Sequence, residues 1–427
     1  MRYLTNLFRK KLKVQFLLAT FVFSAMILVL TLRLSDQIVG EGDVRRCHEK
    51  RNFVFIKCMK TAGTTTMGLL RRFGVRRDLS IVTPTKTHLY INWPFPLTSS
   101  DYRPSQRGYN MLIDHAVFAE KEMSDLMPPD TVYISSIRHP LAHLKSTFAY
   151  FKIPLAVGIP EADQGQNPAK SQNPVEVYFS DPERYEAEYM KSLKTDHNII
   201  ASCIPHGFSL TKNPMSHCLG MPLGFPPGQP DISKDEIAIK TYLEYLERKF
   251  SLIIIVEHFD ESLVLLKRLM CWQLSDILYV SIHVLKYDYK HARLSPRVKR
   301  NHRRWDSIDY QLYDYFNASL WRKIKAQSSD FHDEVKAFKV AQERVRQYCW
   351  AVANLKDGNN VPVYLNETRV PESQWADQFS VTPRDCFYLS DPYRHLQNLQ
   401  IMSDKNDAEL IRKQERYRDN RILKGKC

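Results

Sequence analysis

Four short apolar runs, three of them followed by a helical pattern, constrain the fold of this chain more than any other feature. The runs are Phe53–Ile56, Tyr109–Asp114, Thr131–Ile137 and Phe250–Val256. Apolar runs of this length with β-branched and aromatic residues predict buried strands. Strands that alternate with helices form a mostly parallel sheet flanked by helices, so we predict an α/β fold. In such a sheet, ligands bind where the carboxyl ends of the strands meet.

Helical periodicity and turn-forming residues predict the remaining elements of the chain. The expected helices are Thr64–Phe73, one opened by Pro140, Ser262–Cys271, Ile308–Gln327, Phe331–Tyr348 and Asp404–Arg418. Two stretches rich in Pro, Gly, Asn and Gln, 154–174 and 203–230, interrupt this pattern. We predict that both are loops, and their length suits a role in binding a ligand.

An uncharged segment near the N-terminus predicts a membrane anchor. Val14–Leu32 contains 19 residues without a charge, and at about 1.5 Å per residue a helix of that length crosses a hydrocarbon layer of about 30 Å. Five basic residues precede the segment, so the positive-inside rule places the N-terminus in the cytosol and the rest in the lumen. A cleaved signal peptide is the alternative, but its apolar stretch is usually only about 7 to 15 residues long.

The sequence therefore predicts five parts. Residues 1–13 form a cytosolic tail, 14–32 the transmembrane anchor and 33–51 a stem. Residues 52–350 form the main domain, and 351–427 form an extension packed on it or beside it. A hydrophobic content of 44% with 25% charged residues is sufficient for a sizeable core.

The charge balance favours anionic partners. The net charge is +14, from 61 Lys and Arg residues against 47 Asp and Glu residues, and it attracts phosphates, sulfates, acidic glycans or lipids. A lumenal location excludes nucleic acid. We therefore predict that a basic run is a solvated loop, with a lid over an anionic ligand as the alternative. Its basic residues are Arg293, Arg297, Lys299, Arg300, Arg303 and Arg304.

Cysteines and glycosylation patterns agree with a lumenal domain. The eight cysteines contain no Cys-x-x-Cys pair, which argues against a zinc ribbon and leaves disulfides open. Cys203 and Cys218 flank a loop, and we expect a local bridge between them. Asn317 and Asn366 begin Asn-x-Ser/Thr patterns and are potential N-glycan sites.

The loop between the first strand and its helix is the strongest candidate for binding an anion. Gly63 lets the backbone approach a ligand, and the first N–H groups of a helix lack internal partners. The hydroxyls of Thr64 and Thr65 add donors, and Lys60 can stabilise charge on a leaving oxygen. A solvated lysine in an ordinary turn is the alternative. Because Lys60 precedes Gly63, the loop is not a Walker A sequence, which disfavours a nucleoside triphosphatase.

The loop resembles the 5'-phosphosulfate loop of sulfotransferases that use 3'-phosphoadenylyl sulfate (PAPS). In those families an arginine at a strand end and a serine eight residues later bind the 3'-phosphate, and Arg138 and Ser146 have this spacing. Longer stretches are similar to the galactose 3-O-sulfotransferase family. They are residues 51–65, 138–148, 259–267 with 271–272, and 316–323.

This resemblance implies a P-loop-like sulfotransferase fold, PAPS as co-substrate and no metal. It implies that the acceptor is a terminal galactose of a glycolipid or glycan, and that the enzyme is a type II protein of the Golgi membrane. Lys60 would contact the donor's sulfate, and His115 would be the general base, because imidazole takes up a proton near neutral pH. The donor would be bound by Lys57, Lys60, Thr61, Ala62, Gly63, Thr64, Thr65, Arg138 and Ser146.

The chain departs from the family pattern at two positions. The family's loop commonly reads Thr-His-Lys where this chain has Cys58-Met59-Lys60, and His139 replaces an aspartate. Two alternatives therefore stay open: a lumenal glycan-binding or nucleotide-binding protein without activity, and a sulfotransferase for another sugar position. His139 and His143 have the spacing of a helical metal pair, but Pro140 places His139 outside the helix, so we expect no metal site.

Overall fold

The computed structural model describes residues 47–85, 90–160, 173–192, 204–205, 207–281, 287–354 and 366–390. The chain divides into residues 1–48 and 49–427, and the architecture below is that of the second unit. The predicted anchor at 14–32 and the predicted helix at 404–418 lie outside the described residues. Among the described helices, none has the length and apolar content needed to cross a bilayer.

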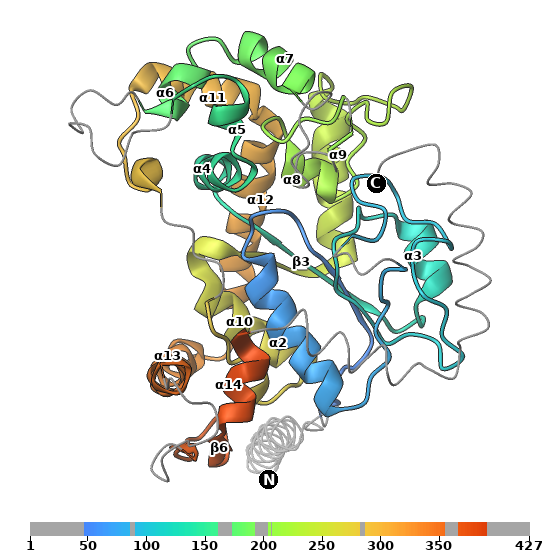
Figure 1. Ribbon diagram of the computed structural model, residues 1–427. Coiled ribbons are helices and arrows are strands. Elements are labelled where there is room, and N and C mark those ends of the chain that lie inside the picture. The colour runs from blue at the N-terminus through green and yellow to red at the C-terminus, as the bar shows by residue number, and fades with distance from the viewer. Residues whose placement is uncertain are drawn as a thin grey trace, which may run out of the picture. The chain divides into compact units, whose positions relative to one another are not determined.

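A four-stranded parallel sheet forms the centre of this unit (Figure 1). Its strands are β1 (Phe53–Ile56), β2 (Met111–Leu112), β3 (Val132–Ile137) and β4 (Phe250–Ile255). The order β2-β1-β3-β4 places β1 between β2 and β3, all running in one direction. The predicted parallel α/β sheet is therefore confirmed, although β2 is shorter than expected.

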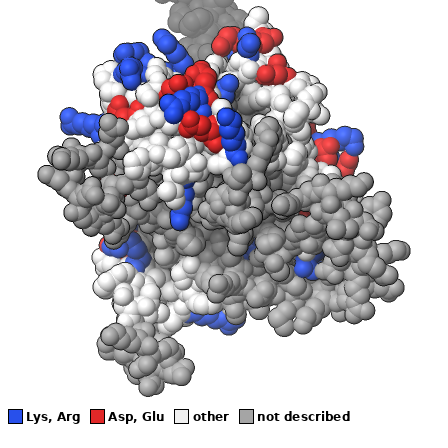
Figure 2. Space-filling model, turned by 45° about the horizontal axis from the view of Figure 1, so that its top comes forward, with Lys and Arg blue, Asp and Glu red and all other residues white. Residues whose placement is uncertain are grey.

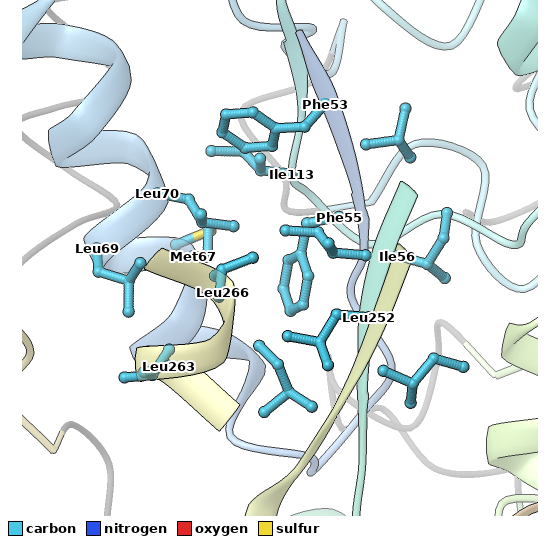
Figure 3. Packing of buried hydrophobic residues seen from close by; sticks show 14 of the residues in the cluster. Phe53, Phe55, Ile56, Met67, Leu69, Leu70, Ile113, Leu252, Leu263 and Leu266 are labelled. Atoms are coloured by element: carbon cyan, nitrogen blue, oxygen red, sulfur yellow. The ribbon is translucent and has the colours of Figure 1, made fainter. Parts of the chain in front are cut away.

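Every residue of β1 and β3 is buried, because helices cover the sheet. Phe55 of β1 points toward α2 (Gly63–Arg76) and α10 (Phe259–Met270), whereas Ile56 points to the opposite side (Figure 3). Alternation along a strand produces this arrangement. Each fully buried side chain of this size stabilises the fold by about 1.5–3 kcal/mol.

The other elements surround this core. The helices are α3 (Glu120–Leu126), α4 (Pro140–Phe151), α5 (Ile153–Ala156), α6 (Pro174–Tyr178), α7 (Pro182–Ser192), α8 (Pro214–Cys218), α9 (Glu236–Lys249), α11 (Pro296–Trp305), α12 (Ser307–Lys325), α13 (Phe331–Ala353) and α14 (Pro383–Ser390). Three 3-10 turns cover Val256–His258, Leu274–Ile277 and Asp288–Lys290, and β5 (Thr368–Val370) pairs with β6 (Phe379–Val381). The helices predicted at 308–327 and 331–348 are confirmed as α12 and α13.

Two predicted loops contain helices, so these predictions are wrong in part. Residues 203–230 contain α8, and residues 154–174 begin within α5. The basic run was expected to be a loop, but from Arg297 on it lies in α11, whose N-terminus is capped by Ser295 Oγ accepting from Val298 N at 3.3 Å. Val298 and His302 turn one face of α11 inward, while its basic residues are exposed. Figure 2 shows acidic and basic side chains interspersed on the face that it draws.

The disulfides differ from the expected one. Cys218 bonds to Cys58, at a sequence separation of 160, and the predicted Cys203–Cys218 bridge is therefore wrong. The fold brings α8 against the end of β1, a proximity that sequence spacing does not reveal. A second bridge, Cys349–Cys386, joins α13 to α14 and ties residues beyond 351 to the main domain.

Candidate functional site

The predicted site residues follow three neighbouring strands whose carboxyl ends lie at one edge of the sheet. The loop with Lys60 follows β1, His115 follows β2, and Arg138 follows β3. Along the chain, β1 is followed by β2 on one side of it and then by β3 on its other side, so the order of the strands changes direction at β1. Such a change of direction leaves a crevice outside the strand ends, where ligands of open α/β sheets bind.

Hydrogen bonds hold the loop after β1 in a tight shape. The hydroxyl of Thr61 is fully buried, donates to Cys58 O at 3.0 Å and accepts from Ser136 Oγ at 2.9 Å. Lys60 and Ala62 have positive φ angles of 57° and 58°. Left-handed backbone costs a residue with a Cβ about 1–2 kcal/mol, and the bonds of Thr61 help to offset this cost. Thr61 therefore shapes the loop from inside.

Gly63 is required because the loop closes over the side chain of Lys57. A Cβ at Gly63 would lie 2.8 Å from Lys57 Cγ and 3.3 Å from Cys58 O. Lys57 is fully buried, with Nζ 3.7 Å from Met67 Sδ on α2. Its ammonium thus lies beneath the loop and contributes positive potential from inside the protein.

The start of α2 is suited to an anion. Its N-cap is Ala62, which provides no capping side chain, and its first turn contains no acidic residue. The first N–H groups of a helix carry positive partial charge and bind anions readily. Thr64 and Thr65 lie in this turn, Thr64 half-buried and Thr65 nearly buried. These residues fit a phosphate group.

Lys60 lies at the outer part of the loop. Its Nζ is 3.9 Å from the centroid of the Tyr150 ring on α4. Burial, together with the positive charge of Arg138, lowers the pKa of Lys60 to about 8. Lys60 is therefore mostly protonated at neutral pH and loses its proton just above it.

Arg138 joins the end of β3 to this loop. Its backbone N–H contacts Met215 Sδ at 3.5 Å, and its Nη1 donates to Lys60 O at 3.5 Å. Its Nε is buried and has no partner in the described part of the chain. A buried guanidinium donor without a partner is costly unless a ligand accepts from it. Ser146 follows two turns along α4 and is nearly buried, so both residues fit a second anionic group.

His115 is bonded directly to the loop. Its Nδ1 lies 2.7 Å from Lys57 O, and since a carbonyl only accepts, Nδ1 carries the proton. Nε2 is then the nitrogen that can accept a proton. Burial, followed by the charges of Lys57 and Lys60, lowers the pKa of His115 well below its usual value, so the ring is neutral at neutral pH. The rings of Tyr90 and Trp93 lie 5.3 and 6.5 Å away.

Asp114, directly before His115, fixes the end of β2. It forms an ion pair with Arg71 of α2 at 2.8 Å, and both side chains are fully buried. Removing one partner of such a pair costs about 3–5 kcal/mol, because the other charge stays buried. The pair therefore determines where the backbone of His115 lies relative to α2.

His143 is a site residue that the sequence did not assign to binding or catalysis. Its Nε2 donates to Met59 O at 2.9 Å, and burial lowers its pKa to about 3, so it is neutral. It anchors the loop backbone beside Lys60. A small pocket next to it is lined by Met59, Trp93, His143, Thr147, Phe151, Leu210 and Pro214.

His139 lies outside α4 as its N-cap, as predicted from Pro140. Its backbone N–H donates to the Glu257 carboxylate at 3.1 Å. In the ranges that the structure describes, no group of three or more His, Cys, Asp or Glu residues is arranged to hold a metal.

The short helix α8 also belongs to the site, and the sequence reasoning missed it. Met215 contacts Arg138, Cys218 is bonded to Cys58 beside Lys60, and His217 Nε2 donates to Pro94 O at 2.8 Å. Asn213-Pro214, a cap-like residue followed by proline, was the signal that could have identified this helix.

Fold and site together define an α/β protein with a basic strand–loop–helix site at the carboxyl edge of a parallel sheet. The sequence model of a family described as galactose-3-O-sulfotransferase matches residues 2–198 and 207–362. The chain therefore belongs to the galactose-3-O-sulfotransferase family, which confirms the resemblance found in its sequence motifs.

Individual relatives agree with this family. Human galactosylceramide sulfotransferase is 30% identical over 320 residues, which cover 73% of this chain and 67% of the relative. Mouse galactose-3-O-sulfotransferase 3 is 29% identical over 301 residues, covering 69% and 62%. Human galactose-3-O-sulfotransferase 2 is 27% identical over 315 residues, covering 72% and 69%. The chain thus spans about two thirds of the length of these relatives.

Proposed function

We propose that the protein transfers a sulfuryl group from PAPS to the 3-hydroxyl of a terminal galactose on a glycolipid or glycan. Family membership and the names of the relatives support this proposal. The observation that carries it is the 2.7 Å bond from His115 Nδ1 to Lys57 O. This bond joins a neutral base to the loop that would bind the donor.

Donor binding is assigned to the two anion-suited places in the site. The start of α2, with Gly63, Thr64 and Thr65, would bind the 5'-phosphate, while Arg138 and Ser146 would bind the 3'-phosphate. Lys57, Thr61 and Ala62 would hold the loop in shape around the first phosphate. The orphaned Arg138 Nε supports this assignment, as does the start of α2, which has no capping side chain and no acidic residue in its first turn.

Sulfuryl transfer then requires that the hydroxyl proton of galactose is taken up and that the charge on the leaving oxygen is stabilised. The galactose hydroxyl oxygen attacks sulfur in line, its proton passes to His115 Nε2, and the bond from sulfur to the 5'-phosphate oxygen breaks. Lys60 stabilises the charge on that oxygen as adenosine 3',5'-bisphosphate leaves. Because Lys57 and Lys60 contribute to the low pKa of His115, donor anions that offset these charges would raise its proton affinity. The step requires no metal.

We assign the protein to the Golgi membrane as a type II protein with a lumenal catalytic domain. The bridges Cys58–Cys218 and Cys349–Cys386 support an oxidising compartment. Asn366 is exposed and suits an N-glycan, whereas Asn317 lies within α12, where its sequon Ser319 is buried and bonded to Glu247.

Replacing the lysine tests this mechanism. Lys60→Ala removes the cation at the leaving oxygen, and we expect kcat to fall about a hundred- to a thousandfold, as when one such donor is deleted. The measurement is sulfate transfer from PAPS to galactosides. Lys121→Ala, at an exposed surface lysine on α3, is the matched control and keeps full activity. Wild-type turnover in Lys60→Ala contradicts the mechanism.

The inactive-protein alternative rests on Met59 and His139. Both residues form their hydrogen bonds here through backbone groups. Met59 O accepts from His143 Nε2, and His139 N donates to the Glu257 carboxylate. Thermal unfolding with adenosine 3',5'-bisphosphate, together with an assay for product, distinguishes an active enzyme from an inactive nucleotide-binding protein. Stabilisation together with product formation supports the enzyme, and stabilisation without product supports the alternative.

A further inference from the structure

One face of α4 lies along the loop that carries Lys60. His143, Thr147 and Tyr150 have the spacing i, i+4 and i+7, which places them on one side of a helix. His143 at one end holds the loop backbone through Met59 O. Tyr150 at the other end lies under the ammonium of Lys60. The same helix thus contacts both the backbone of the loop and its reactive side chain.

The surroundings of Lys60 otherwise favour loss of its proton. Burial and the positive charge of Arg138, from the end of β3, are the two influences that lower its pKa. Two histidines, His115 beyond β2 and His143 on α4, also face the charge of Lys60. Both are neutral, because burial lowers their pKa values. The negative face of an aromatic ring attracts a cation and favours the protonated amine.

We propose that Tyr150 is a positioning residue for Lys60, whose ring holds the lysine ammonium at the loop before the donor binds. The proposal rests on the proposed function, in which Lys60 stabilises the leaving oxygen. Only a protonated lysine can do so. The ring therefore acts through Lys60 in two ways: it restricts where the ammonium lies, and it opposes deprotonation.

Activity should depend on pH accordingly. A lysine whose pKa is lowered to about 8 is charged below that pH and loses its charge as the pH rises through it. We expect kcat/KM to fall on the alkaline side near pH 8. Without the ring, the pKa of Lys60 falls further, and this alkaline limb moves to lower pH.

Three variants test the proposal. In Tyr150→Leu, which keeps an apolar side chain but no ring, we expect kcat/KM to fall about three- to tenfold and the alkaline limb to move about half a pH unit lower. Tyr150→Phe keeps the ring and should keep the wild-type profile. Tyr185→Leu is the matched control, because Tyr185 is also half-buried and lies 5.2 Å from a guanidinium, that of Arg184 on α7. It should leave the profile unchanged.

A second readout does not use the donor. An amine reacts with acetic anhydride only in its neutral form, so labelling at several pH values, quantified by mass spectrometry of the Lys60 peptide, gives the pKa of Lys60. This pKa should be lower in Tyr150→Leu than in the wild type and in Tyr150→Phe. An unchanged pKa and pH profile in Tyr150→Leu overturns the proposal, as does an equal loss in Tyr150→Phe. If Lys60→Ala is inactive while Tyr150→Leu is normal, only the role of Tyr150 fails; if Lys60→Ala is active, the proposed function itself fails.

Discussion

At the scale of single residues, the loop divides its tasks between shape and chemistry. Thr61 and Lys57 are fully buried and determine the shape of the loop, while Lys60 and Thr64 are only partly buried. Gly63 lies where these tasks meet, because it covers the Lys57 side chain and begins the helix. A side chain at this position would have to displace either the Lys57 side chain or the start of α2.

Gly63→Ala tests this division. The new Cβ would lie 2.8 Å from Lys57 Cγ, so the loop must shift, at a cost of about 1–3 kcal/mol for overpacking. We expect a lower Tm and a loss of most stabilisation by adenosine 3',5'-bisphosphate. Gly158→Ala is the control: its Cβ meets nothing within 4 Å, although its φ of +71° adds backbone strain. Full stabilisation by the nucleotide in Gly63→Ala contradicts this account of the loop.

The sequence allowed prediction of where the candidate-site residues that follow strands lie in the fold. His115 and Arg138 come directly after apolar runs and Lys60 comes four residues after one, and parallel strands bring such positions to one edge. His143 and Tyr150 could not be predicted in the same way, because their contacts with the loop depend on where α4 packs. The buried position of Lys57 also depends on packing, since a lysine in a loop is usually solvated.

At the scale of elements, α8 connects the parts of the site. It contacts the loop through Cys218, the end of β3 through Met215 and Pro94 O through His217. Asp309 of α12 holds it by accepting from Met215 N and Ser216 N at 3.0 and 2.7 Å. Burial raises the pKa of Asp309 to about 6. Composition concealed this helix, because its five residues lie in a stretch rich in Pro and Gly.

The bridges Cys58–Cys218 and Cys349–Cys386 provide a matched comparison at this scale. Replacing Cys58 and Cys218 together by Ser releases the donor loop from α8, and we expect a destabilisation of about 2–4 kcal/mol and weaker nucleotide binding. Replacing Cys349 and Cys386 releases α14 from α13 instead, and should lower Tm without changing nucleotide affinity. Calorimetric titration with adenosine 3',5'-bisphosphate measures the nucleotide affinity of both double variants, and thermal unfolding measures their stability. Equal affinity in the two double variants contradicts a role of α8 in holding the loop.

At the scale of the whole molecule, a parallel sheet brings distant segments to one edge. The alternation of apolar runs and helical patterns was sufficient to predict this sheet, since a nearly continuous apolar run is typical of a strand covered on both faces. Long-range features could not be predicted: the partner of Cys218 and the formation of α11 depend on tertiary contacts that local composition does not contain. The predicted anchor at 14–32 stays a prediction.

Transfer of radiolabelled sulfate tests the central claim most directly. The full-length protein, in detergent, is incubated with labelled PAPS and with galactosylceramide, lactosylceramide or N-acetyllactosamine, and the labelled position is determined by linkage analysis. We predict label on the 3-hydroxyl of a terminal galactose in at least one acceptor, and its loss in His115→Ala. Label at another position, no label with any acceptor, or undiminished transfer by His115→Ala would contradict the account.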